Sequence, residues 1–318
     1  LEKAFLKLNE FLKDEARYNE LNNYITLDHF EATKKLIKIS GITPDVIGFH
    51  GQTLFHDPLS KRSIQLGDSQ LLTNLLNIPV ISHFRQNDME NYGQGAPIAP
   101  IYHKFIMNDL KLNLPCCFIN IGGIANITFW DGQKLISFDT GPGNVLLDLY
   151  MQTVLQKQYD RNGFLSSKGT PNQEFIFNCL QHIYFKKKFP KSLDRNEFNG
   201  FLNKIKHYSV NHSDILATLT GFTIASIKKG LNDIGSRPKS IFIVGGGANN
   251  KYLVNQLRKN ININIKTARE IGLDVNMIEA ELIAYLAVRR INNLPITFPG
   301  TTGTKQAVIG GVVFEKFL

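Results

Sequence analysis

Three clusters of glycine follow or connect predicted β-strands, and loops of this kind can hold phosphate. They are Gly122–Gly123, Gly141 with Gly143, and Gly245–Gly247. A residue without Cβ lets backbone N–H groups approach a phosphate closely, and the N-terminus of a following helix adds positive charge. A single cluster is equally well explained by a tight hairpin or a helix entry. Three clusters together favour a nucleotide.

None of the clusters matches a single-loop nucleotide signature. The sequence contains no G-x-x-x-x-G-K-[ST] phosphate loop, and Val244-Gly-Gly-Gly-Ala lacks the spacing of the dinucleotide fingerprint. Hairpin glycine loops with a separate glycine-rich strand end are typical of two-lobed actin-like ATPases, in which nucleotide lies in the cleft between lobes. This step is an analogy of fold.

Asp139 is the candidate catalytic carboxylate. It ends the apolar strand Leu135–Phe138 and opens the turn Thr140–Asn144. A carboxylate on a rigid strand end can accept a proton from a hydroxyl or a water as that oxygen attacks. The alternative is an Asx turn in which Asp139 caps local N–H groups while Asn144 caps the next helix.

Arg85, Asp88 and Gln94 form a polar set directly after the strand Val80–Ile81. Arginine there could bind a carboxylate or phosphate with two parallel hydrogen bonds. An internal pair of Arg85 with Asp88 or Glu90 explains the same residues.

His50 and Gln52, in the turn Gly-Phe-His-Gly-Gln-Thr, are ambiguous, because a histidine beside glycine is often a satisfied turn residue. His56 and Asp57 lie close by, but no paired spacing of histidine and carboxylate supports a metal site made by protein alone.

Glu279 lies near the start of an apolar helix. There a carboxylate must be paired, shifted in pKa or bonded to a ligand, unless it only interacts with the helix dipole.

The elements that must position these residues follow an α/β pattern. The first forty residues predict two helices, the second of which begins at Asp28 and ends at Gly41. Further helices are expected over 69–77 and from 145 to about 155, and a strand, loop and helix over 240–257. The most polar stretch, 159–195, is expected to run over the surface. We place a domain boundary near Asn113, giving lobes 1–113 and 114–318, with the last segment packing back on the first lobe.

Composition excludes several classes of protein. No apolar run approaches the roughly 18 to 20 residues that cross a bilayer. The charge of +9 is spread over single lysines and short helical faces, which argues against nucleic-acid binding. The sequence as given shows no basic-then-apolar leader, so we expect no secretion signal, and the three cysteines suit neither a disulfide framework nor zinc. We expect a cytoplasmic protein.

The motifs together resemble those of the anhydro-N-acetylmuramic acid kinases. The similar segments run in the family's order from Asp45 to the C-terminus; they are IGFHGQTLFHDP, IQLGD, HFRQNDMENYGQGAPIAP, INIGGIANITF, FDTGPGNVLLD, YDRNG, PKSLDRNEF, IVGGGANN and IEAELIAYLA.

The resemblance implies a two-lobed actin/hexokinase (ribonuclease H-like) α/β fold, with mixed sheets flanked by helices and an interlobe cleft. It also implies ATP with Mg²⁺, hydrolysis of the anhydro bridge and phosphorylation of O6 in peptidoglycan recycling, and a possible homodimer. Asp139 matches the family's catalytic base. The residues assigned to substrate are Arg85, Glu279, His50, Gln52, Gln94 and Asn144. Those assigned to nucleotide are Gly122, Gly123, Asn126, Gly141, Gly143, Gly245, Gly246, Gly247 and Asn249.

The sequence departs from the family pattern at several positions. The family opens with a Gly-Thr-Ser-x-Asp-Gly phosphate loop, and this sequence starts at Leu1 with no such turn before His50. We therefore expect an N-terminally incomplete chain with weak or no kinase activity. A catalytically inactive sugar-binding remnant is the alternative. His83 and Asn91-Tyr92 also differ from the residues common in the family, which affects the expected sugar pocket.

Overall fold

The computed structural model describes residues 8–194, 196–209 and 211–316. They form two units, one up to residue 102 and again from residue 279, the other over residues 103–278. The division lies inside helix α6 (Pro100–Asp109) rather than near Asn113, and the C-terminal segment belongs to the first unit. The cleft expected between two lobes stays a prediction.

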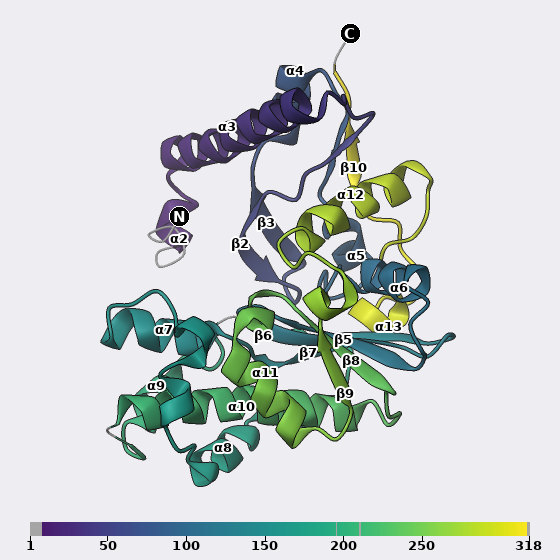
Figure 1. Cartoon of the computed structure of the whole chain (residues 1–318). Helices are drawn as coiled ribbons and strands as arrows, with labels where there is room; N and C mark the ends of the chain where they lie inside the picture. The colour runs from purple at the N-terminus through teal and green to yellow at the C-terminus, as the bar shows by residue number, and fades with distance from the viewer. Residues whose placement is uncertain (1–7, 195, 210, 317–318) are drawn as a thin grey trace. The chain divides into compact units, whose positions relative to one another are not determined.

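A five-stranded mixed sheet forms the centre of the second unit (Figure 1). Its strands are β5 (Cys116–Ile121), β6 (Ile124–Trp130), β7 (Leu135–Pro142), β8 (Ser240–Val244) and β9 (Asn264–Thr267). Their order is β7-β6-β5-β8-β9, with β5, β6 and β7 antiparallel and β8 and β9 parallel to β5. This is the strand arrangement of the ribonuclease H-like fold, so the predicted α/β class with mixed sheets is confirmed.

The sequence explains why β5 and β8 lie in the middle of this sheet. Both are mainly apolar, apart from Asn120 in β5 and Ser240 at the start of β8, and both are almost wholly buried, as expected of strands covered on both faces. Helices α10 (His212–Asp233) and α11 (Lys251–Asn260) pack on one face through Ile227, Leu231, Leu253 and other apolar residues.

A second core in the same unit corrects the expectation for 159–195. The elements around it are α7 (Val145–Val154), η1 (Arg161–Gly163), η2 (Ser166–Lys168), α8 (Gln173–Leu180), η3 (Ile183–Lys186) and α9 (Gly200–Ile205). Phe175, Tyr184 and Phe185 are buried in it against α10. The prediction of a surface excursion was wrong because part of this polar stretch is buried in one cluster, with three large aromatic side chains at its centre, while Tyr159, Phe164 and Phe177 are exposed.

The first unit contains two small sheets. Strands β1 (Ile47–Gly48), β4 (Val80–Ser82) and β10 (Val312–Phe314) form one, and β2 (Gln52–Asp57) and β3 (Arg62–Leu66) form an antiparallel pair. Its helices are α2 (Leu8–Phe11), α3 (Glu15–Ser40), α4 (Ser69–Leu76), α5 (Gln86–Glu90), α12 (Ile278–Ile291) and α13 (Pro299–Thr302). Gly48 lies so close to α12 that an added Cβ would be 2.4 Å from the Ile283 carbonyl oxygen.

The predicted ends of α3 and α4 are reproduced, but the predicted start at Asp28 was wrong, because α3 begins at Glu15 after the cap Asp14. Helix α3 ends at Gly41, whose φ of 68° is a left-handed cap, and α4 is capped by Asp68 at its start and Asn77 at its end. Residues 1–7 of the predicted first helix lie outside the described residues. The loop after β8 is a short 3₁₀ turn, η4 (Gly246–Asn249), and another, η5 (Ala268–Ile271), follows β9. Within the described chain, the helices are too short or too polar to span a membrane.

We predict that Phe185→Ala destabilises the second unit. Phe185 is 2% exposed and stacks on Phe198 at a centroid distance of 5.6 Å, so its loss leaves a cavity. The free energy of unfolding in urea should fall by roughly 3–5 kcal/mol. Phe177→Ala, at a side chain 63% exposed, should change it by less than about 0.5 kcal/mol. Equal stability of the two variants would contradict the second core.

Candidate active site

The three predicted glycine segments meet at one edge of the sheet in the second unit. The turn between β5 and β6 accepts hydrogen bonds from the start of α7: Gly143 N–H donates to the Gly123 carbonyl (2.8 Å), and Asn144 N–H to that of Gly122 (2.8 Å). The loop after β8 packs on the same turn, because a Cβ on Gly247 would lie 2.5 Å from Ile121 Cγ2. The structure therefore brings together the segments that the sequence assigned to nucleotide.

Backbone conformation and close packing explain the glycines here. Gly245 has a φ of 76°, which favours glycine, and an added Cβ would lie 2.3 Å from Asn120 Oδ1. A Cβ on Gly143 would lie 2.3 Å from the Gly122 carbonyl oxygen. By contrast, Gly122 and Gly246 have open space, with nearest atoms at 3.7 and 4.0 Å. This space fits the approach of a phosphate, although the Gly122 N–H itself donates to the Ile124 carbonyl (3.2 Å).

The two asparagines of this edge have different environments. Asn144 begins α7 without a side-chain capping bond, so the alternative in which it caps this helix is wrong, and its amide instead donates to the Ile121 carbonyl (3.3 Å). Asn126 pairs with Asp139 in the β6–β7 register. Its buried Oδ1 has no hydrogen-bond partner among the described residues. An unpaired buried oxygen costs free energy, and a hydrogen-bond donor of a bound ligand would remove that cost. Asn249 is exposed at the end of η4.

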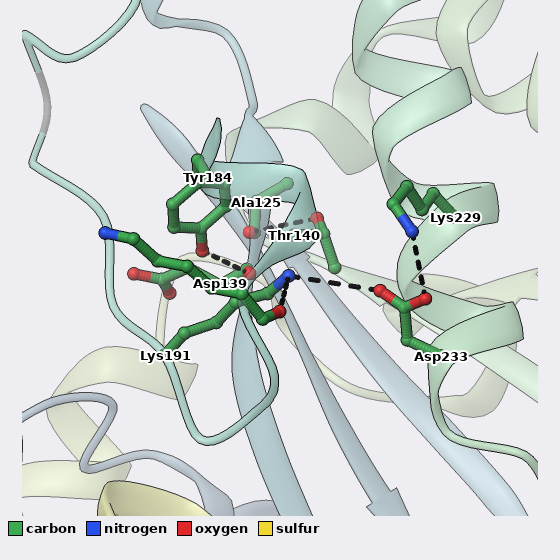
Figure 2. Close-up of polar contacts among 8 residues, drawn as sticks. Ala125, Asp139, Thr140, Tyr184, Lys191, Lys229 and Asp233 are labelled. Carbon is green, nitrogen blue, oxygen red and sulfur yellow. Dashed lines mark hydrogen bonds and ion pairs between the residues drawn. The ribbon is translucent and has the colours of Figure 1, made fainter. Parts of the chain in front are cut away.

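Asp139 is 9% exposed and is held by a distant segment. Its Oδ2 accepts from Leu193 N–H (2.8 Å), and its own N–H donates to the Lys191 carbonyl (3.0 Å). The Tyr184 hydroxyl donates to the Asp139 carbonyl at 2.5 Å, as Figure 2 shows. The Asp139 carboxylate therefore accepts a hydrogen bond from a residue 54 positions later in the chain. An Asx turn would instead bond it to a neighbouring N–H, so the Asx-turn alternative does not describe this contact.

In the first unit, Arg85 and His50 form a polar pair. The Arg85 Nε–H donates to His50 Nε2 (3.1 Å), and its Nη1 donates to the Gly95 carbonyl (2.8 Å). His50 Nδ1 then donates to the Gly51 carbonyl (2.9 Å), which fixes a neutral ring. Burial, followed by the charge of Arg85, lowers the pKa of His50 to about 4. A neutral histidine positions the guanidinium without neutralising it.

His56 and Asp88 complete this set. His56 Nε2 donates to the Gln94 carbonyl (2.9 Å), and burial with the nearby Arg85 lowers its pKa to about 4. Asp88 is fully buried, and its carboxylate accepts from Gly95 N–H (2.6 Å) and the Thr302 hydroxyl (2.6 Å). These bonds hold the loop that carries Gln94.

Two predicted substrate residues lie apart from this hydrogen-bonded set. Gln52 is exposed on β2, where its amide bonds to its neighbour Thr53 (3.3 Å). Glu279 is exposed in the first turn of α12. In the described chain, no group of three histidine, cysteine or acidic residues could hold a metal ion.

Sequence reasoning missed the segment that holds Asp139. Tyr184, Lys191 and Leu193 contact Asp139 from more than forty positions away. Lys191 and Leu193 belong to the motif PKSLDRNEF, but nothing local connected this motif, or Tyr184 upstream of it, to β7. Thr302, the partner of Asp88, was missed for the same reason.

Residues 8–316 match the family model of anhydro-N-acetylmuramic acid kinase. The chain belongs to this family. The relative from Methylobacterium nodulans is 39% identical over 297 residues, covering 92% of this chain and 78% of the relative. That from Pelagibacter ubique is 39% identical over 311 residues, covering 94% and 81%. Both are named anhydro-N-acetylmuramic acid kinase. The resemblance stated from the motifs and the predicted class, a sugar phosphotransferase, are confirmed.

We predict a pH dependence of stability that involves His50. Its pKa is about 4 in the folded chain and about 6.5 when unfolded, so the unfolded chain binds more protons between these values. The contribution of the neutral, buried His50 to the free energy of unfolding is complete above pH 6.5, and it is lost as pH falls from 6.5 towards 4. From pH 7 to 5, His50 should account for about 2 kcal/mol of the loss.

Urea unfolding at both pH values measures this loss. His50→Gln keeps an acceptor for Arg85 but does not titrate, so its unfolding free energy should fall less between pH 7 and 5 than that of the wild type. An identical fall in the two proteins would contradict a buried, neutral His50.

Proposed function

We propose that this protein is an ATP-dependent kinase that hydrolyses the anhydro bridge of 1,6-anhydro-N-acetylmuramic acid and phosphorylates O6, giving N-acetylmuramic acid 6-phosphate in peptidoglycan recycling. The observation that carries the proposal is the meeting of three glycine segments at the sheet edge that also carries Asp139. Family membership supports the substrate class.

The sheet edge where the three glycine segments meet, here called the glycine edge, would bind the phosphates of ATP. The phosphates would lie in the open space beside Gly122 and Gly246, although the Gly122 N–H already donates to the Ile124 carbonyl. Helix α7 begins beside the same turn, so its N-terminus would add positive potential. The buried, unpartnered Oδ1 of Asn126 is a further acceptor for a ligand donor. Mg²⁺ would enter with the nucleotide and keep several waters, as it commonly does when held by substrate phosphates.

Asp139 would act as the general base. Its carboxylate would accept a proton from water as the water oxygen bonds to the anomeric carbon and the bond from that carbon to O6 breaks. The released O6 would take the γ-phosphoryl group. The Leu193 N–H already bonds one carboxylate oxygen, which fixes the orientation of the base before substrate arrives.

The polar set of the first unit would bind the sugar. The Arg85 guanidinium, oriented by His50 and the Gly95 carbonyl, carries the charge that would attract the lactyl carboxylate of muramic acid. Gln94 is held in place through its backbone by Thr302 and His56, and the exposed Gln52 and Glu279 would supply hydrogen bonds to sugar hydroxyls.

We predict that Asp139→Asn, made in the full-length protein, abolishes turnover and leaves ATP binding largely intact. The amide keeps the size of the side chain but cannot act as the base, so kcat should fall by about 10²- to 10⁴-fold. A coupled assay for ADP measures turnover of the anhydro sugar, and calorimetry measures ATP binding. The matched control is Asp131→Asn in the exposed β6–β7 turn, where kcat should stay within about 2-fold of the wild type.

Wild-type turnover in Asp139→Asn would remove this residue from the mechanism. Sugar binding by the wild type without turnover or any response to ATP would instead support the alternative, a sugar-binding protein without catalysis.

A further inference from the structure

The segment from Phe189 to Leu193, here called the 189–193 strap, places the Asp139 carboxylate. It makes two backbone contacts with this residue: the Lys191 carbonyl accepts from Asp139 N–H (3.0 Å), and Leu193 N–H donates to Asp139 Oδ2 (2.8 Å). A shift of the strap would therefore move a direct hydrogen-bond donor of the proposed base.

The Lys191 side chain anchors the strap inside the unit. It is 5% exposed, and its ammonium lies 3.1 Å from the Lys187 carbonyl and 3.9 Å from Asp233 Oδ2 (Figure 2). The same ammonium lies over the Tyr184 ring, 4.9 Å from its centroid. Tyr184 itself bonds the Asp139 carbonyl, so the cation contacts a second residue that touches Asp139.

A buried ammonium is costly without a charged partner, and removing one partner of such a pair leaves an uncompensated charge. Burial lowers the pKa of Lys191, while the nearby Asp233 carboxylate opposes that shift. Asp233 is 29% exposed and also pairs with Lys229 at 3.1 Å, so it is solvated on one side. Lys191 therefore needs the Asp233 carboxylate more than Asp233 needs the Lys191 ammonium.

Asp233 lies on an element that is itself fixed to β7. It ends α10, and the same helix carries Gly230, where an added Cβ would lie 2.6 Å from Thr140 Cγ2. Thr140 follows Asp139 directly, and its hydroxyl donates to the Ala125 carbonyl (3.1 Å). The ion pair thus connects the strap to a helix that packs on the residue beside the proposed base.

We propose that Lys191 is a positioning residue: through its ion pair with Asp233 it fixes the 189–193 strap, so that Leu193 N–H holds the Asp139 carboxylate in the orientation needed to accept a proton. The inference rests on the proposed function of Asp139, and it assigns a role to two charges that do not touch the substrate.

The test compares Lys191→Met with Lys229→Met. Both remove an ammonium that pairs with Asp233, but only Lys191 carries the strap. In Lys191→Met, kcat for the anhydro sugar should fall on the order of 10- to 100-fold, with KM for ATP and sugar within about 2-fold of wild type. In Lys229→Met, kcat should stay within about 2-fold.

Hydrogen–deuterium exchange provides a readout that does not need activity. Amides of 189–194 should exchange faster in Lys191→Met, while those of 135–138 in β7 keep their protection. Where the wild type is active, the proposal requires both the kcat loss and the faster exchange, and either change alone overturns it. An equal kcat loss in Lys229→Met also overturns it.

Two further outcomes are separated by this design. If the wild type does not turn over the sugar, the proposed function fails, and exchange alone then decides whether Lys191 fixes the strap. If Lys191→Met does not fold, Asp233→Asn replaces it, since this partly exposed carboxylate is the other half of the pair. Wild-type kcat and exchange in Asp233→Asn would overturn the proposal.

Discussion

The backbone hydrogen bonds between the turn at Gly122–Gly123 and the residues Gly143 and Asn144 are the constraint on which the candidate site depends. They bring the end of β5, the end of β7 and the start of α7 to one place. A Cβ at Gly143 would fall 2.3 Å from the Gly122 carbonyl oxygen, so only glycine allows this approach. The loop after β8 packs on the same turn through Gly245 and Gly247, which adds the third segment.

This constraint also determines where the proposed base can lie. Asp139 is in β7, a few residues before the joined turns, and its backbone is paired with Asn126 on one side and bonded to the Lys191 carbonyl. Only the side chain of Asp139 is then able to move, and its hydrogen bond with Leu193 N–H restricts this movement as well. In the first unit Arg85 is oriented in a comparable way, by a neutral His50 and a backbone carbonyl. In each unit the charged group is oriented by neutral hydrogen-bonding partners.

Local signals were sufficient to predict much of this arrangement. The glycine pairs indicated the loops because they follow short apolar strands, and the limits of α4 follow from its caps at Asp68 and Asn77. The α/β class followed from the same alternation of elements. Asp139 was identified from its strand end and its glycine neighbours.

Contacts between distant segments could not be read in this way. The bond from Leu193 to Asp139 and the pairing of Lys191 with Asp233 join segments about forty or more positions apart, and no periodicity in either segment reveals the other. The position of Asn144 offered a cap of α7 as an alternative, but its amide donates to the Ile121 carbonyl, because the β5–β6 turn lies beside it. The polar composition of 159–195 did not reveal its buried aromatic residues, because an average over the whole stretch gives little weight to a few large side chains.

The most direct test of the central claim is a titration of the protein with ADP and Mg²⁺, followed by the amide NMR signals of Gly122, Gly143 and Gly246. If the glycine edge binds phosphate, these three signals shift together and saturate at one nucleotide concentration. The signal of Gly235, in the turn after α10, does not shift. Nucleotide binding that shifts other amides and leaves all three glycines unchanged would contradict the account.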